Sequence, residues 1–172
     1  MDKMKYLLVF CFFSAVSQAE TLRGRIVRVA DGDSLTLVTF ANRRVEVRIA
    51  GIDAPERRQP YGAKSKQALA ALCHRRSAAV LTRGKDPYGR TLGQAVYCDG
   101  VYVNAAQVAS GLAWVYPFTR EDPSLTALER EARAGQRGLW RDPAPMPPWE
   151  FRKRHPRPHA GFSYRRFRNS RR

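Results

Sequence analysis

The chain has 172 residues, with 31 lysines and arginines against 15 acidic residues and a formal net charge of +16. This length suits one domain with flanking segments and leaves little room for a second domain. Hydrophobic residues make up 44% of the chain, which is enough for a core. The excess of arginine favours an anionic partner such as nucleic acid, anionic lipid or an acidic wall polymer, and charge alone does not choose among them.

Residues 1–19 differ in character from the rest of the chain. A short basic start is followed by an apolar run over 6–13 and by small residues at Ser17 and Ala19. This order predicts a secretory signal peptide cleaved after Ala19, and the apolar run is too short to span a bilayer comfortably. We therefore expect a secreted or periplasmic protein with no stable membrane insertion after cleavage; an uncleaved anchor is the alternative.

Alternating apolar residues and turn signals predict five short strands with helices between and after them. The strands span 24–30, 35–40, 45–49, 78–82 and 91–97, and the helices span 61–73, 104–111 and 123–135. Asn104 is expected to cap the second helix, and Asp122 with Pro123 is expected to start the third. Such an arrangement suits a small closed barrel, of which the OB-fold is one solution.

The composition changes after Asp142. Prolines come close together, and residues 150–172 contain nine lysines or arginines, several aromatic residues and one acid. A segment of this kind lacks the aliphatic residues for its own core, so we expect a domain over 20–142 and a mobile, Pro-rich basic tail over 143–172. Residues 149–151 could dock on the domain. The tail suits single-stranded nucleic acid, or it serves only solubility.

Cysteines give one further structural prediction. Cys11 would leave with the signal peptide, and the two that remain are Cys73 and Cys98. An even count in an exported protein predicts a disulfide, with two buried free thiols as the alternative. No Cys-x-x-Cys motif or Cys/His cluster indicates zinc.

The scarce acids gather in two places, Asp31-Gly32-Asp33 and the stretch from Asp53 to Glu56. Each alone is typical of a turn or loop. Together they indicate a site for a hard cation, because calcium takes carboxylate and carbonyl oxygens in irregular geometry. Arg48 and Arg90 would complete a phosphoryl-transfer site, since fixed cations stabilise the charge that builds on phosphate oxygens in the transition state.

These motifs, in this order and spacing, resemble the thermonuclease (staphylococcal nuclease-like) family over residues 23–140. The matching stretches are Asp31-Gly32-Asp33-Ser34, R-x-x-x-x-D-x-P-E over 48–56, Gln59-Pro60-Tyr61-Gly62, Asp86-x-Tyr88-Gly89-Arg90, V-N-A-A-Q-V-A-S-G-L-A over 103–113 and Gly138-Leu139-Trp140. The resemblance implies an α+β fold, a five-stranded OB-fold Greek-key β-barrel with about three helices. It also implies a calcium-dependent nuclease that cleaves DNA and RNA and leaves 3′-phosphates.

The resemblance assigns a role to each matching residue. The catalytic group would be Arg48 and Arg90, which clamp the phosphate, and Glu56, which handles the attacking water. The calcium ligands would be the carboxylates of Asp33 and Asp53 and the carbonyl of Ala54, with Asp31 holding the site in place; Tyr88 and Tyr116 would line the nucleotide pocket. The family often has threonine where this chain has Ser34 and Ala54. Serine keeps the hydroxyl, and a main-chain ligand survives the change to alanine.

Two other functions remain open from the sequence. The barrel could be a non-catalytic OB-fold nucleic-acid-binding module, although none of the acid or arginine positions has been lost. A cationic exported protein that acts on envelopes would also explain the charge, but not the motifs. For the nuclease we expect DNA and RNA as substrates, low sequence preference and a monomer.

Overall fold

The protein is described by a computed structural model that covers residues 20–118 and 122–156. The expected signal peptide over 1–19 and residues 157–172 of the expected tail lie outside the described residues, so both stay predictions. Within the described part, no helix has the length and apolar character needed to cross a membrane.

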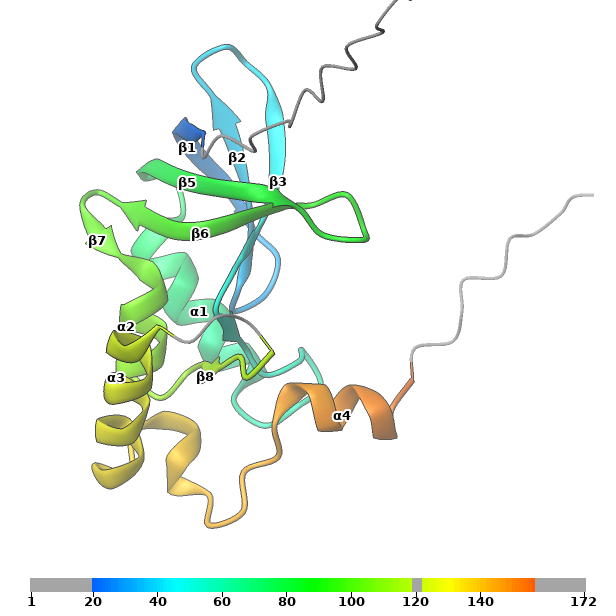
Figure 1. The fold of residues 1–172 in the computed structure, drawn as a ribbon, viewed down its shortest axis with the longest axis vertical. Coiled ribbons are helices and arrows are strands. Elements are labelled where there is room, and N and C mark those ends of the chain that lie inside the picture. The colour runs from blue at the N-terminus through cyan, green and yellow to red at the C-terminus, as the bar shows by residue number, and fades with distance from the viewer. Residues whose placement is uncertain (1–19, 119–121, 157–172) are drawn as a thin grey trace, which may run out of the picture.

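In the described residues, five strands form a closed barrel, whose course can be followed in Figure 1. They are β1 (Thr21–Val29), β2 (Ser34–Thr39), β3 (Arg44–Ile49), β5 (Ser77–Lys85) and β6 (Thr91–Cys98). Their order is β3-β2-β1-β5-β6 with antiparallel neighbours, and a parallel pairing of 47–49 with 91–93 joins β3 to β6 and closes the barrel. The prediction of an α+β OB-fold is confirmed.

Strand β3 shows how the alternating pattern builds both core and site. Val47 and Ile49 are fully buried in the barrel core, whereas Arg44 and Arg48 point to the other side. Because Cβ atoms alternate across a strand, the buried residues fix the direction in which Arg48 leaves the barrel. The hydrophobic core therefore aims a charged side chain at the end of the strand.

Within residues 20–118 and 122–156, four helices and three short strands complete the fold. The helices are α1 (Gly62–Cys73), α2 (Val103–Ala109), α3 (Pro123–Ala134) and α4 (Pro148–Arg154), with a 3-10 turn over Gly138–Arg141; the short strands are β4 (Ile52–Asp53), β7 (Val101–Tyr102) and β8 (Trp114–Val115). In Figure 1, α1, α2 and α3 gather at one end of the barrel, and α4 lies apart from them. The Asp122 side chain accepts the Ser124 amide at 2.9 Å, and Pro123 opens α3, as predicted.

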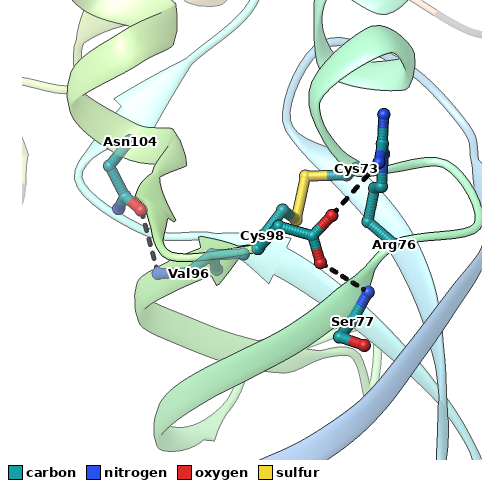
Figure 2. The surroundings of a disulfide bond; sticks show 7 residues. Cys73, Arg76, Ser77, Val96, Cys98 and Asn104 are labelled. Carbon is teal, nitrogen blue, oxygen red and sulfur yellow. Dashed lines mark hydrogen bonds and ion pairs between the residues drawn. A yellow bond between two sulfur atoms is a disulfide. The ribbon is translucent and has the colours of Figure 1, made fainter.

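Asn104 does not cap α2, which corrects the sequence-based expectation. The helix begins one residue earlier, at Val103, and the Asn104 side chain is fully buried. Its Oδ1 accepts the Val96 amide, shown in Figure 2, and its Nδ2 donates to the carbonyls of Ala50 and Gln94. A buried amide must find partners, and here strand edges provide them in place of the helix end.

The predicted disulfide is confirmed. Cys73 at the end of α1 bonds Cys98 at the end of β6, with a Cα–Cα distance of 5.2 Å (Figure 2). Both cysteines are buried. Beside them, Asp99 accepts the Ser77 amide at 3.2 Å and pairs with Arg76 at 3.4 Å. The crosslink thus ties the first helix to the barrel wall.

Helix α4 was not predicted. Part of the segment expected to be a mobile tail forms this helix, which starts at Pro148. Proline suits the first position of a helix, where its missing amide hydrogen is not needed. The boundary between domain and tail at 142 stays a prediction, while the position of α4 matters for the site described next.

Candidate active site

Two acidic side chains meet at one end of the barrel. Asp33 precedes β2, and Asp53 lies in β4, which pairs with β8. The Ala54 amide donates to Asp33 Oδ2 at 2.6 Å and so ties the two segments together. Asp33 is 5% exposed and Asp53 is 1% exposed. Two carboxylates buried this deeply need positive charge close by.

Arg48 supplies part of that charge. Its Nη2 lies 3.2 Å from Asp33 Oδ2 and 3.0 Å from Asp53 Oδ1. Its Nη1 donates to the carbonyl of Ile52 at 3.0 Å and also to the carbonyl of Ile49. The guanidinium is therefore held rigidly across both carboxylates.

The turn over 31–33 is braced from within. The Asp33 amide donates to Asp31 Oδ1 at 3.1 Å, and the supporting role expected for Asp31 stays a prediction. Ser34 Oγ donates to Asp33 Oδ1 at 3.1 Å. Both contacts fix the direction of the Asp33 carboxylate.

The same turn is also held from behind by α2, which the sequence did not reveal. The fully buried Gln107 donates from Nε2 to the Gly32 carbonyl at 2.7 Å. It also lies within hydrogen-bonding distance of Ser65, whose hydroxyl donates to the Leu112 carbonyl at 2.7 Å. A glutamine inside a helix pattern gives no sign of such a role, because the contact spans 75 positions of the chain.

Burial and charge also change the ionisation of Asp33. Burial raises the pKa of its carboxyl from 3.8 to about 7, and the negative charges of Asp31 and Asp53 act in the same direction. The charge of Arg48 and the hydrogen bond from the Ala54 amide lower this pKa but do not outweigh burial. A further cation at this position would favour the ionised carboxylate.

Arg90 approaches from the loop between β5 and β6. Its Nη1 lies 3.4 Å from Ser34 Oγ, so Ser34 connects it to Asp33. Asp86 holds it, accepting from its Nε at 2.7 Å and from its amide at 2.9 Å. Burial opposes ionisation of Asp86, but the hydrogen bonds and charge of Arg90 prevail and lower its pKa.

Glu56, in the loop after β4, meets an arginine that sequence analysis did not single out. Arg152 of α4 places Nη1 at 3.1 Å from Glu56 Oε1. It also forks onto Asp53, with Nη2 at 2.7 Å from Oδ2 and Nη1 at 3.2 Å from Oδ1. Burial works to lower the pKa of Arg152, but Asp53 and Glu56 outweigh it and raise the pKa further above its usual value.

The two predicted tyrosines lie in different surroundings. Tyr88 is 85% exposed in the loop that carries Arg90, whose guanidinium lies 5.7 Å from its ring centre. Tyr116 follows β8 and contacts the rings of Phe118 and Trp149 at centre distances of 5.3 and 6.1 Å. The two tyrosines therefore lie on different segments of the chain, and their nucleotide-binding roles stay predictions.

The donor atoms fit a hard cation. Asp33 and Asp53 offer carboxylate oxygens, and Ala54 follows directly on the chain and adds a main-chain carbonyl. Among residues 20–118 and 122–156, no group of three or more His, Cys, Asp or Glu side chains is arranged to hold a metal ion. A cation here would need the carbonyl and water as well, which calcium accepts.

Comparison with known proteins identifies the family. A sequence model described as "Staphylococcal nuclease homologue" matches residues 46–142. The chain belongs to the staphylococcal nuclease family. The match covers Arg48, Asp53, Glu56 and Arg90, and Asp33 lies just before it.

Relatives from several bacteria resemble three quarters or more of the chain. A protein of Escherichia coli O157:H7 named "Uncharacterized endonuclease" is 41% identical over 151 residues, which are 87% of this chain and 98% of that protein. One of the same name from Haemophilus influenzae is 38% identical over 95% of this chain and 90% of its own. The "Micrococcal nuclease" of Shigella flexneri is 39% identical over 76% and 80%. Family and relatives together support a nuclease function for this chain.

Proposed function

We propose that the protein is an exported, calcium-dependent endonuclease that hydrolyses DNA and RNA with low sequence preference and leaves 3′-phosphates. The observation that carries the proposal is the meeting of Asp33, Arg48 and Asp53 at bonding distance, with Glu56 and Arg90 joined to the same cluster. Such a set of acids and guanidinium groups addresses a phosphate and a water, and not base edges.

The arginines would bind the scissile phosphate from two sides. Arg48 is fixed by the carbonyls of Ile49 and Ile52, and Arg90 by the carboxylate of Asp86. Guanidinium groups held in this way need little rearrangement as charge builds on the phosphate oxygens, so they stabilise the transition state more than the ground state. Glu56 would accept the proton of the water that attacks phosphorus. Breakage of the bond to the 5′ oxygen would then leave a 3′-phosphate and a 5′-hydroxyl.

Asp33, Asp53 and the Ala54 carbonyl would hold calcium. When bound, the ion would supply a positive charge that polarises a phosphate oxygen and helps to position water. The three protein ligands leave room for substrate and solvent in its coordination sphere, which commonly takes six to eight oxygens. Asp31 and Ser34 would keep Asp33 aimed at this position.

The biological setting is part of the proposal. The leader over 1–19 and the Cys73–Cys98 disulfide support export to an oxidising compartment, either the periplasm or the outside of the cell. A monomer suffices, because every residue of the proposed mechanism comes from one chain. The net charge of +16 would draw polyanionic substrates to the protein.

The test is a cleavage assay on plasmid DNA and on RNA, with wild type and Glu56→Gln side by side. We expect cleavage in calcium, none in a calcium chelator, and 3′-phosphate ends on the products. Glu56→Gln should lose roughly 100-fold or more in rate, the usual contribution of a general base. Full activity of wild type in chelator, or of Glu56→Gln in calcium, would remove the basis of the proposal.

A further inference from the structure

Helix α4 places one arginine directly on the acids of the site. Arg152 binds both oxygens of Asp53 with both of its terminal nitrogens, at 2.7 and 3.2 Å. It also reaches Glu56 at 3.1 Å. This is the bidentate geometry in which guanidinium binds carboxylate most strongly. Asp53 and Glu56 lie 99 and 96 positions before Arg152, so the contact depends on the docking of a distant helix.

We propose that α4 is a built-in inhibitor of the site, in which Arg152 occupies the Asp53 carboxylate in place of the metal cation and holds Glu56, so that the helix must leave before calcium binds. This inference rests on the proposed function, since it names what regulates that same site. In the docked state the site is closed to the cation; in the undocked state it is open.

The competition follows from the atoms involved. Calcium binds carboxylate oxygens at roughly 2.3–2.6 Å, closer than a guanidinium approaches them. Arg152 already contacts both oxygens of Asp53, and Arg48 shares one of them. A calcium ion bound to Asp53 while both arginines stay in place would be repelled by two guanidinium charges in a poorly hydrated site. Arg48 is anchored by main-chain carbonyls, so Arg152 is the group that can give way.

Helix α4 is short and buries little surface against the rest of the protein. It has seven residues, and Pro148 is its one buried residue. Trp149 anchors it through ring contacts with Trp114, Tyr116 and Phe118 at centre distances of 5.7, 6.1 and 6.3 Å. A cavity of about 240 Å³ is lined by Pro55 and Pro60 of the loop after β4 and by Met146 and Phe151 of the segment that carries the helix. Short elements with little buried surface open at small cost.

Two states of this kind obey simple arithmetic. The apparent affinity for calcium equals the intrinsic affinity multiplied by the fraction of molecules in which the helix is undocked. If the helix is docked in about nine molecules of ten, its loss tightens the apparent Kd roughly tenfold. Calcium must in turn displace the docked helix, and more so at higher calcium concentration, because linkage is reciprocal.

The test compares calcium binding by wild type, Arg152→Gln and Lys153→Gln, measured by titration calorimetry on the full chain without substrate. Lys153→Gln is the matched control, because it removes one charge from the same helix but its Nζ contacts Glu150 at 3.5 Å, outside the site. We expect a Kd roughly tenfold lower for Arg152→Gln and a change below about twofold for Lys153→Gln. Trp149→Ala, which weakens docking but keeps Arg152, should shift the Kd in the same direction as Arg152→Gln.

A second measurement follows the helix itself. Hydrogen exchange of the α4 amides in wild type should speed up when calcium is added. Cleavage at low calcium should be faster for Arg152→Gln than for wild type, and the two rates should approach each other at saturating calcium.

The possible outcomes distinguish failure of the inhibitory role of α4 from failure of the proposed nuclease function. Equal calcium affinity in wild type and Arg152→Gln overturns the inhibitor and leaves the nuclease intact. Slower cleavage by Arg152→Gln with unchanged calcium affinity also overturns it, and makes Arg152 a third phosphate-binding arginine. If neither protein binds calcium, both the inhibitor and the calcium-dependent function fall.

Discussion

Replacing Gly32 by alanine should disturb the site without touching any of its charged groups. A Cβ at position 32 would lie 1.8 Å from Ser65 Oγ, 2.7 Å from Ala54 Cβ and 2.8 Å from Ser65 Cβ. Turning the Ser65 hydroxyl away would break its bond to the Leu112 carbonyl, which costs about 1 kcal/mol. The two carbon contacts would remain, so the turn that carries Asp33 must shift, at about 1–3 kcal/mol for overpacking.

We therefore expect Gly32→Ala to lose about 2–4 kcal/mol of unfolding free energy, measured by urea denaturation in chelator. Calcium should also protect the variant less than wild type, because Asp33 moves with the turn. Gly135→Ala is the control: its φ is −84°, and the nearest atom to a new Cβ is 3.3 Å away, so its change should stay below about 1 kcal/mol. If Gly32→Ala unfolds like Gly135→Ala and responds normally to calcium, the tight packing behind the turn is not what positions Asp33.

Two further predictions concern stability. Removing the disulfide in Cys73→Ala/Cys98→Ala should cost about 3.5 kcal/mol of unfolding free energy, from a loop that spans 25 positions; a loss below about 1 kcal/mol in urea denaturation would contradict it. The raised pKa of Asp33, from 3.8 to about 7, means that the folded state keeps a proton which the unfolded state has already released. Metal-free wild type should therefore lose about 3 kcal/mol of unfolding free energy between pH 4 and 7, a loss that is absent from Asp33→Asn; pH profiles that run parallel in the two proteins would rule this out.

Much of the fold followed from local pattern. Alternation of apolar residues predicted the strand over 45–49, in which the structure buries Val47 and Ile49, and the even cysteine count predicted the disulfide that links Cys73 to Cys98. The first inference succeeds because a strand has a period of two, and the second because two cysteines that pair leave no unpaired thiol. The prediction that Asn104 caps α2 was wrong, because the local sequence does not show that this side chain is buried and bonded elsewhere.

The residues of the candidate site could be chosen from the sequence, because its motifs keep their order and spacing. Asp33, Arg48 and Asp53 lie at bonding distance from one another, and the roles that the resemblance implies for them stay predictions. Arg152 could not be singled out, because it is one of nine basic residues in its segment and nothing local marks it. The role of Gln107 was hidden for a related reason: both contacts are long in sequence and arise only when helices pack against the barrel.

The most direct test of the account is the rate of DNA cleavage as a function of calcium concentration, for wild type and for Asp53→Asn at matched folded fraction. We predict a rate that rises with calcium and saturates in wild type, and cleavage at least about 100-fold slower in Asp53→Asn at every concentration. Cleavage by wild type that does not depend on calcium, or an Asp53→Asn curve that follows wild type, would show that the buried carboxylates are not the centre of the chemistry.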